Sequence, residues 1–298
     1  MIRRVIYIFS AVIFFSSCED VIEVESGFEE SQLVVDAWLD NLDREQKVRL
    51  TQSQDYFDSN FSAAVEGAEV NLIINGERSI EFEETAPGDY TWTPETTDEI
   101  GEVGDTYELE IKIGAETFRA ESEMRRVPKI DSISQVFEEE SLGVPEGIYA
   151  ELNATDFFGQ GDTYWVRTWK NDTLLNKPLE ILVIYDATFD PGNSLDGVPF
   201  IFPIRRGINP FPDDIDNIDD IPPPYMPGDS IYVELHSITN DAFRFWTIAQ
   251  EQMINGENGI FALPVANTRG NVIQQSTGER VLGFFNVAAT ETASKVIE

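Results

Sequence analysis

Acidic side chains crowd one stretch of the chain, at a spacing that could bind a cation. Asp213, Asp214 and Asp216 lie in the tract PDDIDNIDDIPPP. Carboxylate oxygens are ligands that Ca²⁺ prefers, and extracellular Ca²⁺ sites can work at weak affinity. The tract does not follow the EF-hand pattern, because no Gly follows its acids in register. We expect no resident cofactor and interpret the tract as a solvated acidic loop, with weak Ca²⁺ binding as the alternative.

Side chains that would carry enzyme chemistry are scarce, or they follow no catalytic motif. His236 is the only histidine and Cys18 the only cysteine, which disfavours zinc and haem sites built from ordinary protein ligands. No G-x-S-x-G, H-E-x-x-H or P-loop pattern occurs. The 55 Asp and Glu residues are too many for spacing to select the carboxylate pair of a glycosidase. We expect His236 to be a shielded strand residue and the protein not to be an enzyme, with a hydrolase as the third-ranked function.

Cys18 stands at a position where covalent lipid attachment is expected. Arg3 and Arg4 precede an apolar run over residues 5–15, and two serines separate that run from Cys18. This is the layout of a secretory signal peptide, and F-S-S-C resembles the bacterial lipobox, whose Cys is lipidated after cleavage. The run is shorter than the roughly 18 residues needed to span a bilayer. We expect a signal peptide over 1–17 and a lipid anchor on Cys18.

Negative charge dominates the chain and limits the partners it can have. The sequence has 20 Lys and Arg against 55 Asp and Glu, a net charge of −35. Nucleic acid is not an expected partner, because its phosphates would be repelled. Anionic lipid headgroups would be repelled as well, so membrane attachment should depend on the acyl chains. Residues 18–30 are interpreted as an acidic tether between the lipid and the fold.

Aromatic residues cluster in the segment TYWVRTWK. Trp165 and Trp169 share one face of a predicted strand with Arg167. Exposed tryptophans on a sheet face would favour carbohydrate stacking, whereas packing in a core or at its rim is the alternative. Arg167 on the same face also predicts a cation–π contact. The two tryptophans are therefore low-ranking candidates for binding a ligand or partner.

The elements that position these residues are predicted to be mainly β-strands. Apolar and polar residues alternate along several short segments, and Asn-Gly, Pro-Gly and other Gly-containing turns separate them. Evenly spaced short strands favour an all-β architecture. We expect an immunoglobulin-like sandwich over residues 31–126. Its predicted strands are 32–40, 46–52, 68–75, 89–93, 106–114 and 117–124.

A second β-rich domain is predicted over residues 127–298, because Pro128 marks a junction and the chain exceeds one typical domain length. One helix is expected at 241–255, after the N-cap Asn240. The predicted strands are 133–139, 147–156, 162–170, 179–186, 229–239 and 280–290.

A long Pro- and Asp-rich insert at residues 187–228 interrupts this second domain. A loop of this length is usually functional or disordered. Its apolar side chains, Phe200, Phe202 and Phe211 among them, are unusual for a solvated loop. They could pack on the parent domain or form a face that binds a partner or ligand.

Several stretches, taken in order, resemble a known family. Together they are similar to the Bacteroidota lipoproteins grouped as domain of unknown function 4249, over almost the whole chain after Cys18. The stretches are SSCEDVIEVE, QLVVDAWLD, LTQSQDYFD, GDTYELEIKIGAETFRAESEMRRVPKIDSI and GERVLGFFNVAA.

The resemblance implies a location and a role. Members look like outer-membrane lipoproteins on the cell-surface side, often encoded near TonB-dependent receptors. A binding subunit of a TonB-dependent nutrient uptake system is therefore implied, with the receptor as partner and an unknown ligand. Glu19, Asp20 and Glu23 look like an export signal to the surface, with a flexible spacer as the alternative. A structural or adhesive surface lipoprotein is the competing function.

Overall fold

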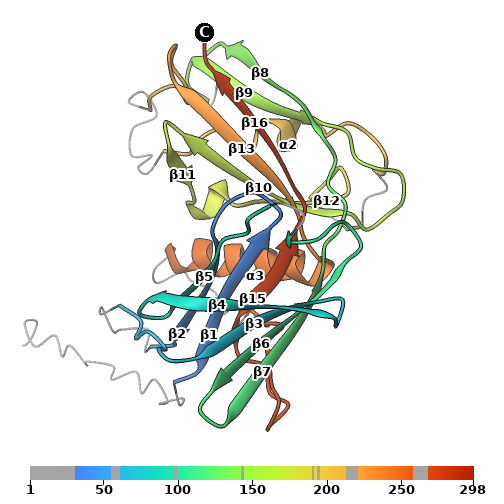
Figure 1. The fold of residues 1–298 in the computed structure, drawn as a ribbon. Helices are drawn as coiled ribbons and strands as arrows, with labels where there is room; N and C mark the ends of the chain where they lie inside the picture. The colour runs from blue at the N-terminus through green and yellow to red at the C-terminus, as the bar shows by residue number, and fades with distance from the viewer. Residues whose placement is uncertain are drawn as a thin grey trace, which may run out of the picture.

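The fold is mainly β, as the sequence alternation predicts, and it forms two lobes (Figure 1). Within the described part of the chain, no helix is both long enough and apolar enough to cross a membrane. The computed structural model describes residues 31–54, 61–96, 99–141, 144–189, 191–192, 195–212, 221–257 and 268–298.

The first lobe is a nine-stranded sheet with the strand order β14-β7-β6-β3-β4-β5-β2-β1-β15. Its strands are β1 (Leu33–Asp40), β2 (Gln46–Gln52), β3 (Glu69–Ile74), β4 (Arg78–Ala86), β5 (Asp89–Trp92), β6 (Thr106–Ile113), β7 (Glu116–Glu123), β14 (Ile273–Gln274) and β15 (Leu282–Ala288).

This sheet curls into a sandwich-like form rather than dividing into two separate sheets. The first half of β4 pairs with β3 and its second half pairs with β5, with a register shift between Glu84 and Ala86. A strand that pairs with two different neighbours along its length, with a bulge close by, is a common way to turn a corner between sheet layers. The two arms then meet where the backbone N–H of Val287 on β15 donates to Oγ of Ser122 on β7, at 3.1 Å.

The alternation along β1 shows how the sequence divides the two sides of this sheet. Val35, Ala37 and Leu39 are buried in the core of the first lobe, while Asp36 and Trp38 point to the outer face. Full burial of a Val or Leu side chain contributes roughly 1.5–3 kcal/mol relative to exposure. The inner residues of β1 therefore fix its register, and the outer residues are free to build a surface.

The second lobe pairs a five-stranded sheet with a two-stranded one. In the larger sheet the order is β11-β10-β13-β16, with β12 also paired to β10, and β8 pairs with β9. The strands are β8 (Ile130–Glu138), β9 (Gly147–Ala154), β10 (Thr163–Lys170), β11 (Thr173–Leu175), β12 (Leu182–Tyr185), β13 (Ser230–Ser237) and β16 (Thr290–Val296). A short helical turn, η2 (Pro178–Glu180), precedes β12.

Much of the insert at 187–228 packs on its own lobe. It contains the short helix α2 (Phe202–Arg206). Phe200, Ile204 and Tyr225 are buried in the core of the second lobe, and the Tyr225 hydroxyl donates to the carbonyl of Ile208 at 2.6 Å. The apolar side chains of the insert thus supply core, which is why a loop with so many prolines can be ordered around them.

Two strands from the C-terminal part of the chain belong to the first lobe. β15 pairs in parallel with β1, with Val35 opposite Gly283, and β14 pairs with β7. The next strand, β16, then lies in the second lobe, beside β13. The first lobe therefore contains strands from beyond residue 127 as well as those before it. Alternation along a strand shows which residues share a face, but it does not specify the partner of the strand.

The helix α3 (Asn240–Glu257) lies where the lobes meet (Figure 1), and the helix predicted at 241–255 is confirmed. It contributes to a mixed aromatic and aliphatic cluster that contains residues from both lobes. Phe284 of β15 stacks on Trp38 of β1 at 5.5 Å between ring centroids, and Phe243 of α3 is buried in the same cluster. Aromatic packing of this kind stabilises one relative placement of the lobes.

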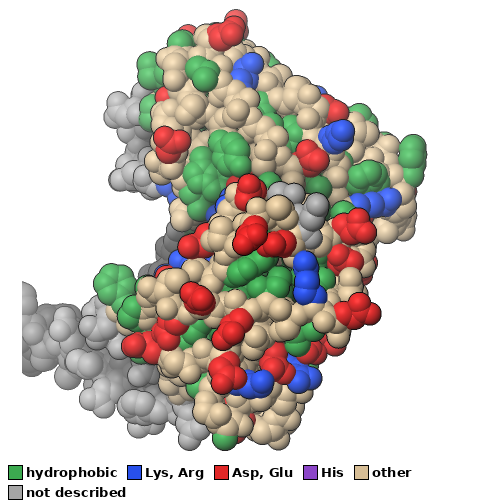
Figure 2. All heavy atoms as spheres, in the orientation of Figure 1, with side chains coloured by type: hydrophobic (Ala, Val, Ile, Leu, Met, Phe, Trp, Pro, Cys, Tyr) green, Lys and Arg blue, Asp and Glu red, His purple; other side chains and the backbone are tan. Residues whose placement is uncertain are grey.

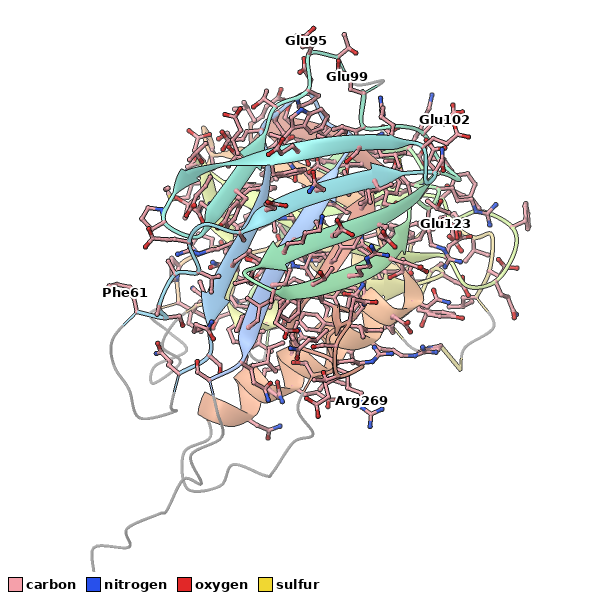
Figure 3. All side chains as sticks on the ribbon, turned by 60° about the horizontal axis from the view of Figure 1, so that its bottom comes forward. Phe61, Glu95, Glu99, Glu102, Glu123 and Arg269 are labelled. Atoms are coloured by element: carbon pink, nitrogen blue, oxygen red, sulfur yellow. The ribbon has the colours of Figure 1, made fainter. Side chains whose placement is uncertain are left out.

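Acidic side chains lie mostly on the outside. Figure 3 shows Glu95, Glu99, Glu102 and Glu123 pointing away from the first lobe at its rim. Figure 2 shows acidic side chains scattered over the same lobe, and a surface that is hollowed between the two lobes. The excess negative charge is thus spread over solvated positions, where its electrostatic cost is smallest.

Candidate functional site

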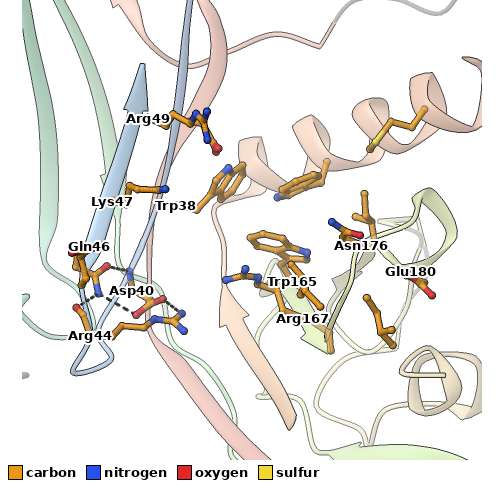
Figure 4. A pocket seen from close by; sticks show the side chains of 18 residues that line it. Trp38, Asp40, Arg44, Gln46, Lys47, Arg49, Trp165, Arg167, Asn176 and Glu180 are labelled. Carbon is orange, nitrogen blue, oxygen red and sulfur yellow. Dashed lines mark hydrogen bonds and ion pairs between the residues drawn. The ribbon is translucent and has the colours of Figure 1, made fainter. Parts of the chain in front are cut away.

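A cleft of about 670 Å³ lies between the lobes. We call it the interlobe cleft. The outer face of β1 and β2 forms one wall; β10, β11 and the η2 turn form the other, and α3 contributes Trp246 and Met253. Figure 4 shows Lys47 and Arg49 on the first wall and Asn176 and Glu180 on the opposite one. Ligand sites of proteins have volumes in this range and often lie between domains.

Three tryptophans from three elements meet in the interlobe cleft. Trp38 lies on β1, Trp165 on β10 and Trp246 on α3. The ring centroids are 5.3 Å apart for Trp38 and Trp165, 5.1 Å for Trp38 and Trp246, and 4.7 Å for Trp165 and Trp246. Nε1 of Trp246 has no hydrogen-bond partner among the described residues. The cluster thus gives the cleft an apolar aromatic surface.

Glu234, on β13, is the centre of a charged group beside the tryptophans. Its side chain is 0% exposed, yet its carboxylate oxygens have hydrogen-bond partners. Arg44 donates to it with both terminal nitrogens, at 2.5 and 3.1 Å, and the Tyr232 hydroxyl donates at 3.1 Å. His236 Nε2 lies 2.8 Å away. Because Arg44 follows β1 in the first lobe, this contact joins the two lobes.

The environment of Glu234 keeps it ionised. Burial acts to raise its pKa, but the hydrogen bonds from His236 and Arg44 outweigh burial and lower the pKa to about 2. Burial also lowers the pKa of His236, against the opposing effect of Glu234. A neutral His236 that donates from Nε2 leaves Nδ1 to accept from the Thr290 hydroxyl, at 2.9 Å. At neutral pH, Glu234 therefore cannot serve as a general acid.

Asp40 completes the ion-pair network, which we define as Asp40, Arg44, Arg167, Glu234 and His236. Arg44 forms an ion pair with Asp40 as well as with Glu234. Donor atoms of Asp40, Glu234 and His236 lie within 4.8 Å of one another, a spacing that a metal ion could use. A metal ion there would have to displace the Arg44 guanidinium that already neutralises both carboxylates. The three residues are therefore better described as an ion-pair network than as a metal centre.

Arg167 lies between two indole rings. Its guanidinium carbon is 5.1 Å from the ring centroid of Trp165 and 4.9 Å from that of Trp169, so the predicted cation–π contact is confirmed. The nearest carboxylate oxygen, on Glu234, is 3.5 Å away. Burial lowers the pKa of Arg167, against the attraction of Glu234. Figure 4 shows its guanidinium between Trp165 and the Arg44–Asp40 pair.

A second group of charges lies on the β1–β2 wall. Lys47 and Arg49 both approach Asp89, at 3.1 and 3.6 Å. Burial in the interlobe cleft raises the pKa of Asp36, although Arg49 and Lys47 act to lower it. The cleft therefore holds cations and acids in near balance, in a chain whose acids outnumber its cations by 55 to 20.

The structure separates the residues that the sequence suggested as sites. Trp165 lines the interlobe cleft, whereas Trp169 covers the far side of Arg167. Phe200 is only 2% exposed and packs against Tyr164, so it supplies core rather than binding surface. Phe202 and Phe211 are 51% and 41% exposed. The remaining candidates lie outside the described residues, namely Cys18, Glu19, Asp20, Glu23, Asp213, Asp214 and Asp216.

Sequence reasoning did not identify the ion-pair network. His236 and Glu234 stand on one strand face, but Arg44 reaches them from 190 positions away in the chain. A weak signal was present in β13, where Tyr232, Glu234 and His236 occupy alternate positions that a plain core strand would fill with apolar residues. That pattern indicates a functional or interlobe face without identifying its partner.

No protein with a curated description matches the chain. A model of the family described as "Domain of unknown function (DUF4249)" matches residues 19–294. That match covers both lobes, the interlobe cleft and every member of the ion-pair network. Because it extends over most of the chain, the protein belongs to the DUF4249 family.

Proposed function

We propose that this protein is a binding lipoprotein of the bacterial outer membrane, and that it holds a small ligand in the interlobe cleft without transforming it. The observation that carries the proposal is the cleft itself, about 670 Å³ between two lobes and lined by three tryptophans beside charged side chains. An apolar site with a few convergent polar groups is the usual form of a small-molecule site.

The absence of catalysis in this proposal rests on the chemistry of the cleft. Asp40 lines the cleft, and both Asp40 and the buried Glu234 pair with Arg44. With its pKa lowered to about 2, Glu234 holds no proton to give at neutral pH. The pair therefore lacks the free acid that glycoside hydrolysis requires.

The proposed location rests on the sequence before the first lobe. The apolar run, the two serines and Cys18 have the order of a lipoprotein signal, and acids follow directly. We further propose, from the family resemblance, a Bacteroidota-type surface lipoprotein that serves a TonB-dependent receptor. In this role the interlobe cleft would capture the nutrient and the receptor would transport it.

Replacing Cys18 with alanine is expected to release the protein from the membrane fraction. The net charge of −35 offers no attraction to anionic lipids, so the acyl chains should supply nearly all of the membrane affinity, at about 0.8 kcal/mol per buried methylene. Fractionation of cells that express either form would measure this. Retention of the Cys18→Ala protein in washed membranes would show that the lipid anchor is wrongly assigned.

Association with a receptor can be tested by purification of the tagged full-length protein after mild detergent extraction. Recovery of a TonB-dependent β-barrel receptor with the tagged protein would support the accessory role. Recovery without any such barrel, from cells grown under several nutrient limitations, would contradict it. A structural or adhesive surface role would then be the better description, while the cleft would still need a ligand.

A further inference from the structure

We propose that the interlobe cleft recognises an organic carboxylate, a small molecule with one carboxylate and a flat apolar body, through the guanidinium of Arg167. The inference rests on the proposed function in one respect, since it takes the interlobe cleft as the ligand site. It goes further by naming the chemical class of the ligand and the residue that selects it.

Arg167 has donors to spare. Among the described residues, none of its N–H groups makes a hydrogen bond, its buried Nε included. The nearest acid is Glu234, at 3.5 Å, but the oxygens of Glu234 already accept closer bonds from Arg44, Tyr232 and His236. A guanidinium that lacks a bidentate partner normally pairs with a carboxylate or phosphate.

The position of Arg167 is fixed before any ligand arrives. The rings of Trp165 and Trp169 cover its two sides, at 5.1 and 4.9 Å from the guanidinium carbon. Its side chain is 25% exposed and lines the interlobe cleft. A donor that is already ordered and partly desolvated loses little entropy on binding, so its charge-assisted hydrogen bonds contribute more to affinity. The same partial burial also lowers the pKa of Arg167.

The surrounding walls favour a carboxylate over a phosphate and can hold an apolar body. Among the described residues that line the cleft there is no Ser or Thr hydroxyl to share the extra oxygens of a phosphate. The apolar part of the lining comes from Trp38, Trp246, Leu174 and Met253, which suit a flat hydrophobic group.

The charge pattern fits a single anionic group. Lys47 and Arg49 line the same cleft and share one acid, Asp89. Asp36 lies on the same wall, where Arg49 and Lys47 partly offset its negative charge. Arg167, Lys47 and Arg49 all line this cleft, in a chain whose net charge is −35.

The test compares two probes that differ only in charge, 1-naphthylacetate and its neutral amide 1-naphthylacetamide. Binding to the purified full-length protein would be measured by ligand-observed saturation-transfer NMR. We expect the carboxylate to bind with a Kd of the order of 1 mM or tighter, and at least about tenfold tighter than the amide. Equal affinities, or no binding of either probe, would overturn the proposal without any variant having to fold.

Arg167→Gln should reduce the affinity for the carboxylate to that for the amide while the affinity for the amide stays unchanged. Arg167→Lys should keep part of the preference, since it keeps the charge and loses the planar fork. Arg244→Gln is the matched control, because the Arg244 side chain is 71% exposed on α3, does not line the cleft and pairs with Asp241; it should leave both affinities unchanged. A carboxylate preference that survives Arg167→Gln would overturn the assignment. Failure to recover a receptor would contradict the transport role and leave this ligand preference intact.

Discussion

Replacing Glu234 with alanine is expected to lower the free energy of unfolding by about 3–5 kcal/mol. The carboxylate is fully buried and accepts hydrogen bonds from Arg44, Tyr232 and His236. Its removal leaves the guanidinium of Arg44 with Asp40, and it takes from Arg167 its nearest carboxylate. Removing one partner from a buried ion pair is costly chiefly because the other charge stays buried.

Urea unfolding followed by tryptophan fluorescence would measure this loss, because Trp38, Trp165 and Trp246 lie beside the network. Glu234→Gln keeps the shape and removes the charge, so it should lose somewhat less than Glu234→Ala. The control is Asp241→Ala, which breaks an exposed ion pair with Arg244 and should change stability by at most about 1 kcal/mol. Similar losses at positions 234 and 241 would mean that the ion-pair network contributes no more to stability than an exposed ion pair does.

The same network gives stability a defined pH dependence. The folded pKa of Glu234 is about 2, below its ordinary 4.5, so its contribution is complete above pH 4.5 and is lost as the pH falls toward 2. This shift corresponds to about 3 kcal/mol at neutral pH. The pKa of His236 is also lowered, from 6.5, so its contribution is lost as the pH falls below 6.5. Arg44, Asp40 and Arg167 face both groups and keep the sign unchanged.

Stability of the native protein should therefore fall in two stages on acidification, beginning below pH 6.5 and steepening below pH 4.5. His236→Phe should remove the first stage and weaken the second, because His236 donates one of the hydrogen bonds that lower the pKa of Glu234. Unfolding midpoints in urea, measured between pH 7 and pH 3, would reveal both. A midpoint that rises between pH 6.5 and pH 5 in the native protein would contradict the sign derived for His236.

Local signals in the sequence were sufficient to predict most strands and the long helix. Thr106 to Ile113 alternate as expected and form β6, and the helix expected at 241–255 is observed at Asn240–Glu257. Within β6, Glu110 is a polar position of this alternation, yet it is buried and paired with Arg119 on β7 and with Lys112. Alternation predicts which residues share a face, and cross-strand pairing decides how far a charged one is covered.

What the sequence could not reveal is which distant segments meet. β16 has Thr290, Thr292 and Ser294 on one face, so it carries too little apolar alternation to be predicted as a strand. The interlobe cleft needs β1, β10 and α3 together, and no local pattern encodes their contact. Arg167 between two tryptophans was predicted because all three residues lie on one strand; Arg44 beside Glu234 was not, because it depends on how the lobes join.

That junction depends on β15, and Gly283 is the residue whose replacement should disturb it most. Gly283 has φ = +85°, and a Cβ there would lie 1.9 Å from the carbonyl oxygen of Val35 on the paired strand β1. The neighbouring atoms are backbone, so no side-chain movement can relieve the contact. Left-handed strain of about 1–2 kcal/mol adds to an overpacking cost of about 1–3 kcal/mol. Gly283→Ala should therefore lower the free energy of unfolding by about 3 kcal/mol or more.

Gly278→Ala separates the two contributions. Gly278 has a similar φ of +75°, but a Cβ there would meet nothing within 4 Å, so its replacement should cost only the backbone strain of about 1–2 kcal/mol. Urea unfolding gives both losses, and native-state hydrogen exchange shows where the extra loss acts. The amides of β1 and β15 should exchange faster in Gly283→Ala than in Gly278→Ala, because the parallel pair must open to admit the methyl group. Equal losses in the two variants, with unchanged protection of β1, would mean that β15 does not pair there. Because β15 leads directly into β16 of the second lobe, the same result would also remove the structural basis of the interlobe cleft.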